Sequence, residues 1–190
     1  MSYASFVKVK ARTAAEICAH LDLKKEARSL LCDGMSPREF VEALATKQQY
    51  VTGIEFIAHA LPAREGIWWG CLCLQHTCGN NLSGADRAAC QAVVQWVVQP
   101  TEANRAAAKA PAETAGPASP AGALATAVNQ TGGNIAPPKA PPMSPLPFAP
   151  AKAVSNAVKL VSVRSEPAKI VDTQRAFLEL GIRIAEGHFI

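Results

Sequence analysis

The sequence lacks the features that define membrane, secreted and nucleic-acid-binding proteins. No stretch approaches the ~20 uninterrupted apolar residues of a membrane-spanning helix, and the first residues lack the apolar core of a signal peptide. Aromatic residues make up only 6% of the chain, and its 19 lysines and arginines are scattered among 15 acidic residues. These basic residues do not gather into a stretch of the sequence that would form a nucleic-acid-binding surface. We therefore expect a cytoplasmic protein that contacts neither a membrane nor nucleic acid.

Patterns that indicate catalysis or cofactor binding are also missing. No set of nucleophile, base and orienting group can be assembled from the sequence, and no glycine-rich phosphate loop is present. We expect no catalytic residue, no cofactor and no enzymatic activity. Six cysteines are present, and in a reducing compartment we expect them to be free thiols rather than disulfides.

What is present favours helices. The chain has 190 residues, 49% of them hydrophobic, and alanine is abundant while β-branched runs are short. Helix-start signals are clear: Thr13 with Glu16 and Ser36 with Glu39 have the form of capping boxes, and Ser83 can cap a third helix. No fixed repeat period is found. The sequence predicts an all-α fold, a compact irregular array of helical hairpins.

Composition divides the chain into three parts. Residues 1–110 carry the helical array. Residues 111–150 are rich in alanine, proline and glycine, hold half of the 14 prolines between 137 and 150, and predict a linker or extended strap with one short helix inside it. Residues 151–190 predict a pair of C-terminal helices. The second of them carries too much apolar surface to remain in water, so we expect the pair to dock on the array.

The segment from residue 67 to 78, "IWWGCLCLQHTC", is unusually rich in cysteine. Its first part is apolar on every side, which is typical of a central helix surrounded by neighbours. Gly70, Cys71 and Cys73 are small enough to let other helices approach, and Trp68 and Trp69 can fill the wider gaps. We therefore predict that Cys71 and Cys73 are buried and reduced.

Other interpretations of the same segment remain open. Cys71 and Cys78 would lie about 10 Å apart along a helix axis, too far for one zinc ion. A thiol- or metal-dependent regulator or enzyme would need residues 71–90 to converge, and its metal ligands would be Cys73, His76, Cys78 and Cys90. A third hypothesis is a small-ligand binder that uses a tryptophan-lined interior.

Glu55 and His59 lie four residues apart, the spacing of neighbours on one helix face. The pair could act as acid and base. Such pairs are routine on exposed helices, so we expect Thr52, Glu55 and His59 to form a solvated face opposite the apolar one.

The stretch "FIAHALPAREGIWWGCLC", with "MSPREFVEAL" before it and "APPKAPPMSPLP" after it, resembles an uncharacterised family of bacterial proteins known as a domain of unknown function. Its most specific part has the pattern ALPxRExxWW. The resemblance implies a bacterial, cytoplasmic, helical protein and supplies no activity or site residue. Together with the missing catalytic patterns, it favours a non-catalytic interaction or adaptor module, an accessory component of a larger assembly with a protein partner.

Overall fold

The computed structural model describes residues 6–79, 81–136 and 139–188, and within these ranges it contains helices and no strand. The elements are α1 (Ala14–Cys18), α2 (Lys25–Arg28), α3 (Pro37–Thr46), α4 (Tyr50–Ala60), α5 (Ala63–Cys78), α6 (Gly84–Val98), α7 (Glu102–Ala107), α8 (Lys109–Ala115), α9 (Pro120–Asn129), α10 (Ala149–Ser162), the short 3₁₀ helix η1 (Pro167–Lys169) and α11 (Ile170–Ala185). The predicted all-α fold is confirmed.

The predicted helix starts are present where local capping signals occur. At α1 the backbone N–H of Thr13 donates to Glu16 Oε1 at 3.2 Å. At α3 the backbone N–H of Ser36 donates to Glu39 Oε2 at 2.8 Å, and Pro37 occupies the first helical position. At α6 the Ser83 hydroxyl accepts from the next turn. These contacts satisfy backbone N–H groups that have no partner inside the helix.

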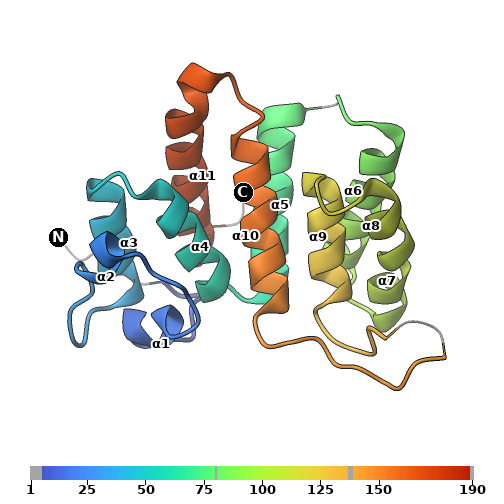
Figure 1. Ribbon diagram of the computed structural model, residues 1–190, viewed down its shortest axis with the longest axis horizontal. Coiled ribbons are helices and arrows are strands. Elements are labelled where there is room, and N and C mark those ends of the chain that lie inside the picture. The colour runs from blue at the N-terminus through green and yellow to red at the C-terminus, as the bar shows by residue number, and fades with distance from the viewer. Residues whose placement is uncertain (1–5, 80, 137–138, 189–190) are drawn as a thin grey trace.

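Two groups of helices share a central pair, α5 and α10 (Figure 1). On one side α4 and α11 pack together and contact the central pair, with α3 against α4. On the other side α9 packs against α5, α6, α8 and α10. The core therefore runs through the whole bundle instead of ending at residue 110.

The C-terminal helices are part of this core. The indole N–H of Trp69 on α5 donates to the backbone carbonyl of Phe177 on α11 at 2.9 Å, across 108 residues of sequence. A Cβ atom at Gly181 would lie 2.7 Å from Ile57 Cγ2 and 3.0 Å from Trp69 Cε2. Only glycine at this position lets α11 lie so close to α4 and α5.

Residues 111–129 are not a linker, which corrects the assignment made from composition. The predicted short helix exists as α9, but it is a core element: Leu124, Ala125 and Val128 are fully buried. A Cβ atom at Gly70 of α5 would collide with Leu124, as expected for a residue that admits a neighbour. Because α9 is made largely of small residues, its composition resembles that of a linker. The helix nevertheless packs closely against its neighbours.

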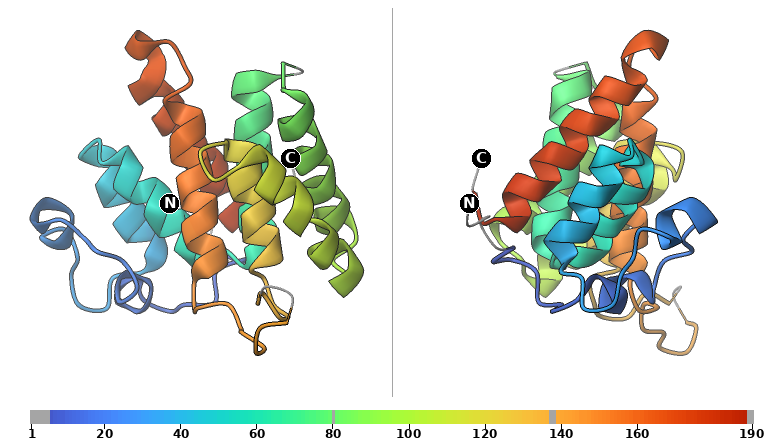
Figure 2. Two further views of the ribbon diagram at one scale, coloured as in Figure 1. Left: turned by 45° about the vertical axis from the view of Figure 1, so that its right-hand side comes forward. Right: turned by 90° about the vertical axis from the view of Figure 1, so that its left-hand side faces the viewer.

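The proline-rich residues 139–148 follow α9 and lie outside the core. Met143 and Leu146 are exposed, and the segment is tied back by its backbone, since the N–H of Met143 donates to Asn134 Oδ1 at 2.8 Å. Both views in Figure 2 place this segment at the same end of the bundle as α1. Pro137 and Pro138, the start of the predicted arm, lie outside the described residues.

Candidate functional site

The cysteine-rich segment forms the buried middle of the bundle. Cys73 on α5 is fully buried and Cys71 nearly so, which confirms the prediction that they belong to the core. Burial raises the pKa of both thiols well above the usual value. Burial is also the main cause that raises the pKa of Cys90 on α6 to about 11. These thiols are therefore protonated and poorly nucleophilic at neutral pH.

The residues named for a metal site lie in different surroundings. Cys73 is enclosed in the core, while His76 is exposed and lies edge-on to Phe177, with ring centroids 5.8 Å apart. Cys78 and Cys90 are half-buried. Within the described ranges, no three histidine, cysteine, aspartate or glutamate side chains converge as metal ligands.

The thiols give a direct test of this arrangement. We expect Cys71 and Cys73 to resist a thiol reagent in the native protein and to react fully after denaturation, because both side chains are enclosed. Cys32 is exposed and serves as the internal control that reacts at once. Mass spectrometry of labelled peptides at timed intervals measures each site. Rapid native labelling of both Cys71 and Cys73 would contradict their place in the core.

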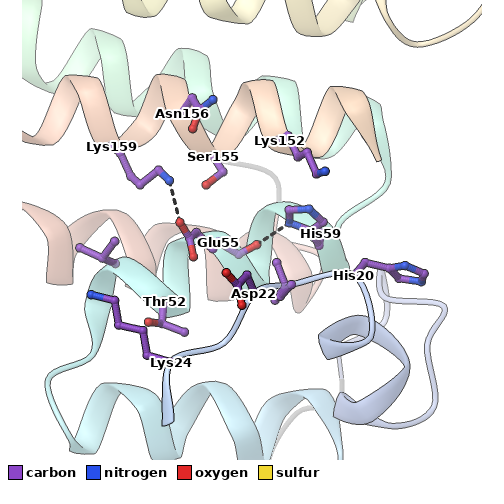
Figure 3. A pocket seen from close by; sticks show the side chains of 12 residues that line it. His20, Asp22, Lys24, Thr52, Glu55, His59, Lys152, Ser155, Asn156 and Lys159 are labelled. Atoms are coloured by element: carbon purple, nitrogen blue, oxygen red, sulfur yellow. Dashed lines mark hydrogen bonds and ion pairs between the residues drawn. The ribbon is translucent and has the colours of Figure 1, made fainter. Parts of the chain in front are cut away.

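A hollow of the surface lies between α4, α10 and the segment that joins α1 to α2 (Figure 3). Its volume is about 670 Å³, and it is open to solvent. We call it the α4–α10 groove. Its lining is mainly polar and comprises His20, Leu21, Asp22, Lys24, Val51, Thr52, Glu55, His59, Lys152, Ser155, Asn156 and Lys159.

Thr52, Glu55 and His59 form one wall of the groove, so the prediction of a solvated helix face is wrong. All three are half-buried, because α10 lies against this side of α4. Lys159 Nζ on α10 donates to Glu55 Oε1 at 2.6 Å. No local pattern predicts this contact between α4 and α10, because the two residues are 104 positions apart in the sequence.

His59 is held in one tautomer. Its Nδ1 lies 2.8 Å from the backbone carbonyl oxygen of Glu55. A carbonyl oxygen only accepts, so Nδ1 carries the hydrogen and Nε2 of the neutral ring has a free lone pair. Burial, the largest cause, lowers the pKa of His59, and nearby Lys152 and His20 lower it further, against the opposing effect of Glu55. The ring is therefore neutral at pH 7.

Two polar atoms of the groove have no hydrogen-bond partner among the described residues. They are Nε2 of His59 and the hydroxyl oxygen of Ser155, and both are buried. The Ser155 side chain is only 3% exposed, and it points from α10 toward α4 (Figure 3). Since the two atoms do not bond to each other, they do not form the hydrogen-bonded nucleophile and base that acyl transfer requires.

The lining of the groove carries more positive than negative side chains. Three lysines, Lys24, Lys152 and Lys159, line it against two carboxylates, Asp22 and Glu55. Lys159 is engaged by Glu55, whereas neither Lys24 nor Lys152 has a carboxylate partner in the described part of the chain. The arrangement offers cations and hydrogen-bonding groups to a ligand and no activated nucleophile.

Phe148 contacts two histidines of the groove lining. Its ring stacks on His20 with centroids 3.9 Å apart and lies 6.0 Å from the ring of His59. The residue adopts φ 60°, a left-handed conformation that costs energy for a phenylalanine. These ring contacts fix the end of the proline-rich segment to the groove.

Sequence reasoning named His59 and Glu55 but missed Lys24, Lys152 and Ser155. One signal was available: Lys152, Ser155 and Lys159 follow one another at intervals of three and four residues, which places them on one face of α10. Nothing in the sequence showed that this face meets α4.

Fold and site together define an all-helical protein with a polar surface groove. Residues 40–185 match the family described as "Family of unknown function (DUF6931)", and the chain belongs to that family. The expected membership of an uncharacterised family is thereby confirmed. No curated protein and no solved structure matches the chain. None of the helices in the described ranges is long and apolar enough to cross a membrane.

Proposed function

We propose that the protein is a non-catalytic interaction module, an accessory component of a larger bacterial assembly in the cytoplasm. In this proposal the α4–α10 groove receives a segment of a partner protein. The observation that supports it most is the lining of the groove: charged and hydrogen-bonding side chains surround an open hollow of about 670 Å³, and they include no bonded nucleophile and base.

The rival function, a thiol- or metal-dependent regulator or enzyme, is less well supported. It needs reactive or convergent side chains among Cys71, Cys73, His76, Cys78 and Cys90. Burial disfavours the thiolate at three of these positions, Cys71, Cys73 and Cys90. The groove, in contrast, places its polar side chains at the surface of α4 and α10, where a partner can reach them.

Site-specific cross-linking in the native cell tests the proposal. A photoreactive amino acid is placed at Asn156, which is exposed in the groove, and in a matched variant at Gln91, which is exposed on α6 outside it. We expect irradiation to link one recurrent protein to position 156 and not to position 91. Capture of the same protein at both positions, or at neither, would contradict a partner in the groove.

A further inference from the structure

Lys24 and Lys152 lie at opposite corners of the groove (Figure 3). Lys24 comes from the segment before α2, and Lys152 comes from the first turn of α10. Both are exposed and neither is paired with a carboxylate of the described residues. An extended chain with carboxylates at intervals can place one carboxylate at each corner.

The two unpartnered atoms of the groove, His59 Nε2 and the Ser155 hydroxyl, can bond to a ligand that supplies one hydrogen-bond donor and one acceptor. Nε2 of His59 has a lone pair to accept with, and the hydroxyl of Ser155 can donate. A backbone amide supplies both complements, because its N–H donates and its carbonyl oxygen accepts. Each buried polar atom without a partner costs free energy, so a ligand that supplies the partner gains affinity. Both atoms are buried, so side chains of the groove lining must move to admit the amide.

We infer that the occupant of the α4–α10 groove is an extended acidic segment of a partner protein. Its carboxylates pair with Lys24 and Lys152, and a backbone amide between them meets His59 and Ser155. This inference rests on the proposed function, since it names the chemistry of the segment that the groove receives.

The charges of the groove favour such a peptide over nucleic acid. Asp22 and Glu55 lie in the same lining as the three lysines, so a ligand with a phosphate at every residue would meet repulsion as well as attraction. A peptide can place its few carboxylates at the lysines and neutral residues beside Asp22.

Binding of defined probes to the full-length protein tests the inference. The probes are hexaglutamate, hexaglutamine and hexalysine peptides, inorganic phosphate and a single-stranded RNA hexamer. We expect hexaglutamate to bind more tightly than the other four and to shift the backbone NMR signals of residues 20–24, 52–59 and 152–159. Tighter binding of phosphate or RNA, or shifts located elsewhere, would overturn the inference.

Two double variants with the same change in net charge test whether Lys24 and Lys152 bind the acidic peptide. Lys24→Glu with Lys152→Glu should weaken hexaglutamate binding by at least about tenfold at low salt, because each reversal replaces attraction by repulsion. Lys25→Glu with Lys47→Glu changes two exposed lysines outside the groove and should alter binding by less than about twofold. Equal losses in both variants would mean only a general charge effect and would overturn the assignment.

Ser155→Ala separates binding from folding. Removal of an unpartnered buried hydroxyl should leave the melting temperature unchanged or raise it, while the affinity for hexaglutamate falls severalfold. A lower melting temperature, or an unchanged affinity, would show that Ser155 has only a structural role.

The experiments distinguish failure of the proposed function from failure of the acidic-peptide inference. If position 156 captures a partner but hexaglutamate does not bind, the groove is an interaction site and the acidic occupant is wrong. If hexaglutamate binds in the groove but no partner is captured in the cell, the acidic preference stands and the proposed function fails.

Discussion

Residues 1–110 expressed alone are expected to show no cooperative thermal unfolding. The fragment lacks buried side chains that α9, α10 and α11 contribute to the shared core, among them Leu124, Val158 and Phe177. It would leave the facing sides of α5 and α4 in water, at a cost of about 25 cal/mol for each Å² of apolar surface. Circular dichroism on heating measures the loss, with the full chain as reference. A soluble fragment with an undiminished melting temperature would contradict the shared core.

A cut in the proline-rich segment is the matched control. A protease site introduced at residues 143–146, which are largely exposed, should allow cleavage without loss of the fold, because both pieces keep their core contacts. The cleaved protein should run as one species in size-exclusion chromatography and melt cooperatively. Dissociation after cleavage would show that the C-terminal helices add little to the core.

Replacement of Trp69 by alanine is expected to lower the free energy of unfolding by about 3 to 5 kcal/mol. The ring is fully buried on α5, and its indole N–H holds the carbonyl of Phe177 on α11. The substitution leaves a large cavity between two parts of the bundle and removes their hydrogen bond. For a chain of this size the loss lowers the melting temperature by on the order of 10 °C. Urea denaturation followed by circular dichroism measures it.

Trp68→Ala is the control, because it removes the same volume from a neighbouring residue that is only half-buried. Its cost should be clearly smaller. If Trp69→Ala does not fold, Trp69→Phe keeps most of the packing and should cost about 1 kcal/mol through the lost hydrogen bond. A loss below about 1 kcal/mol for Trp69→Ala would place this ring at the surface, where truncation leaves no cavity.

Local signals explain how much of the fold was predictable. Capping residues at 13, 36 and 83 act on backbone groups within one turn, so the helix starts follow from neighbours in sequence. The apolar stretch around Cys71 and Cys73 likewise predicted a buried helix, because it offers no polar side to water. The all-α class follows from the same local preferences.

Long-range packing decided the rest. The sequence of α9 is compatible with a helix or a linker, and its burial depends on contacts with α5, α6 and α10 that no local pattern encodes. The groove has the same origin. Glu55 and His59 share a helix face by their spacing alone, but only the tertiary structure brings Lys152, Ser155 and Lys159 against that face.

The sequence by itself determined where helices start and which face is apolar, since these depend on residues within a turn or two. The tertiary structure decided which faces meet, since that depends on the fit of side chains far apart in the sequence, such as Glu55 and Lys159, which are 104 positions apart.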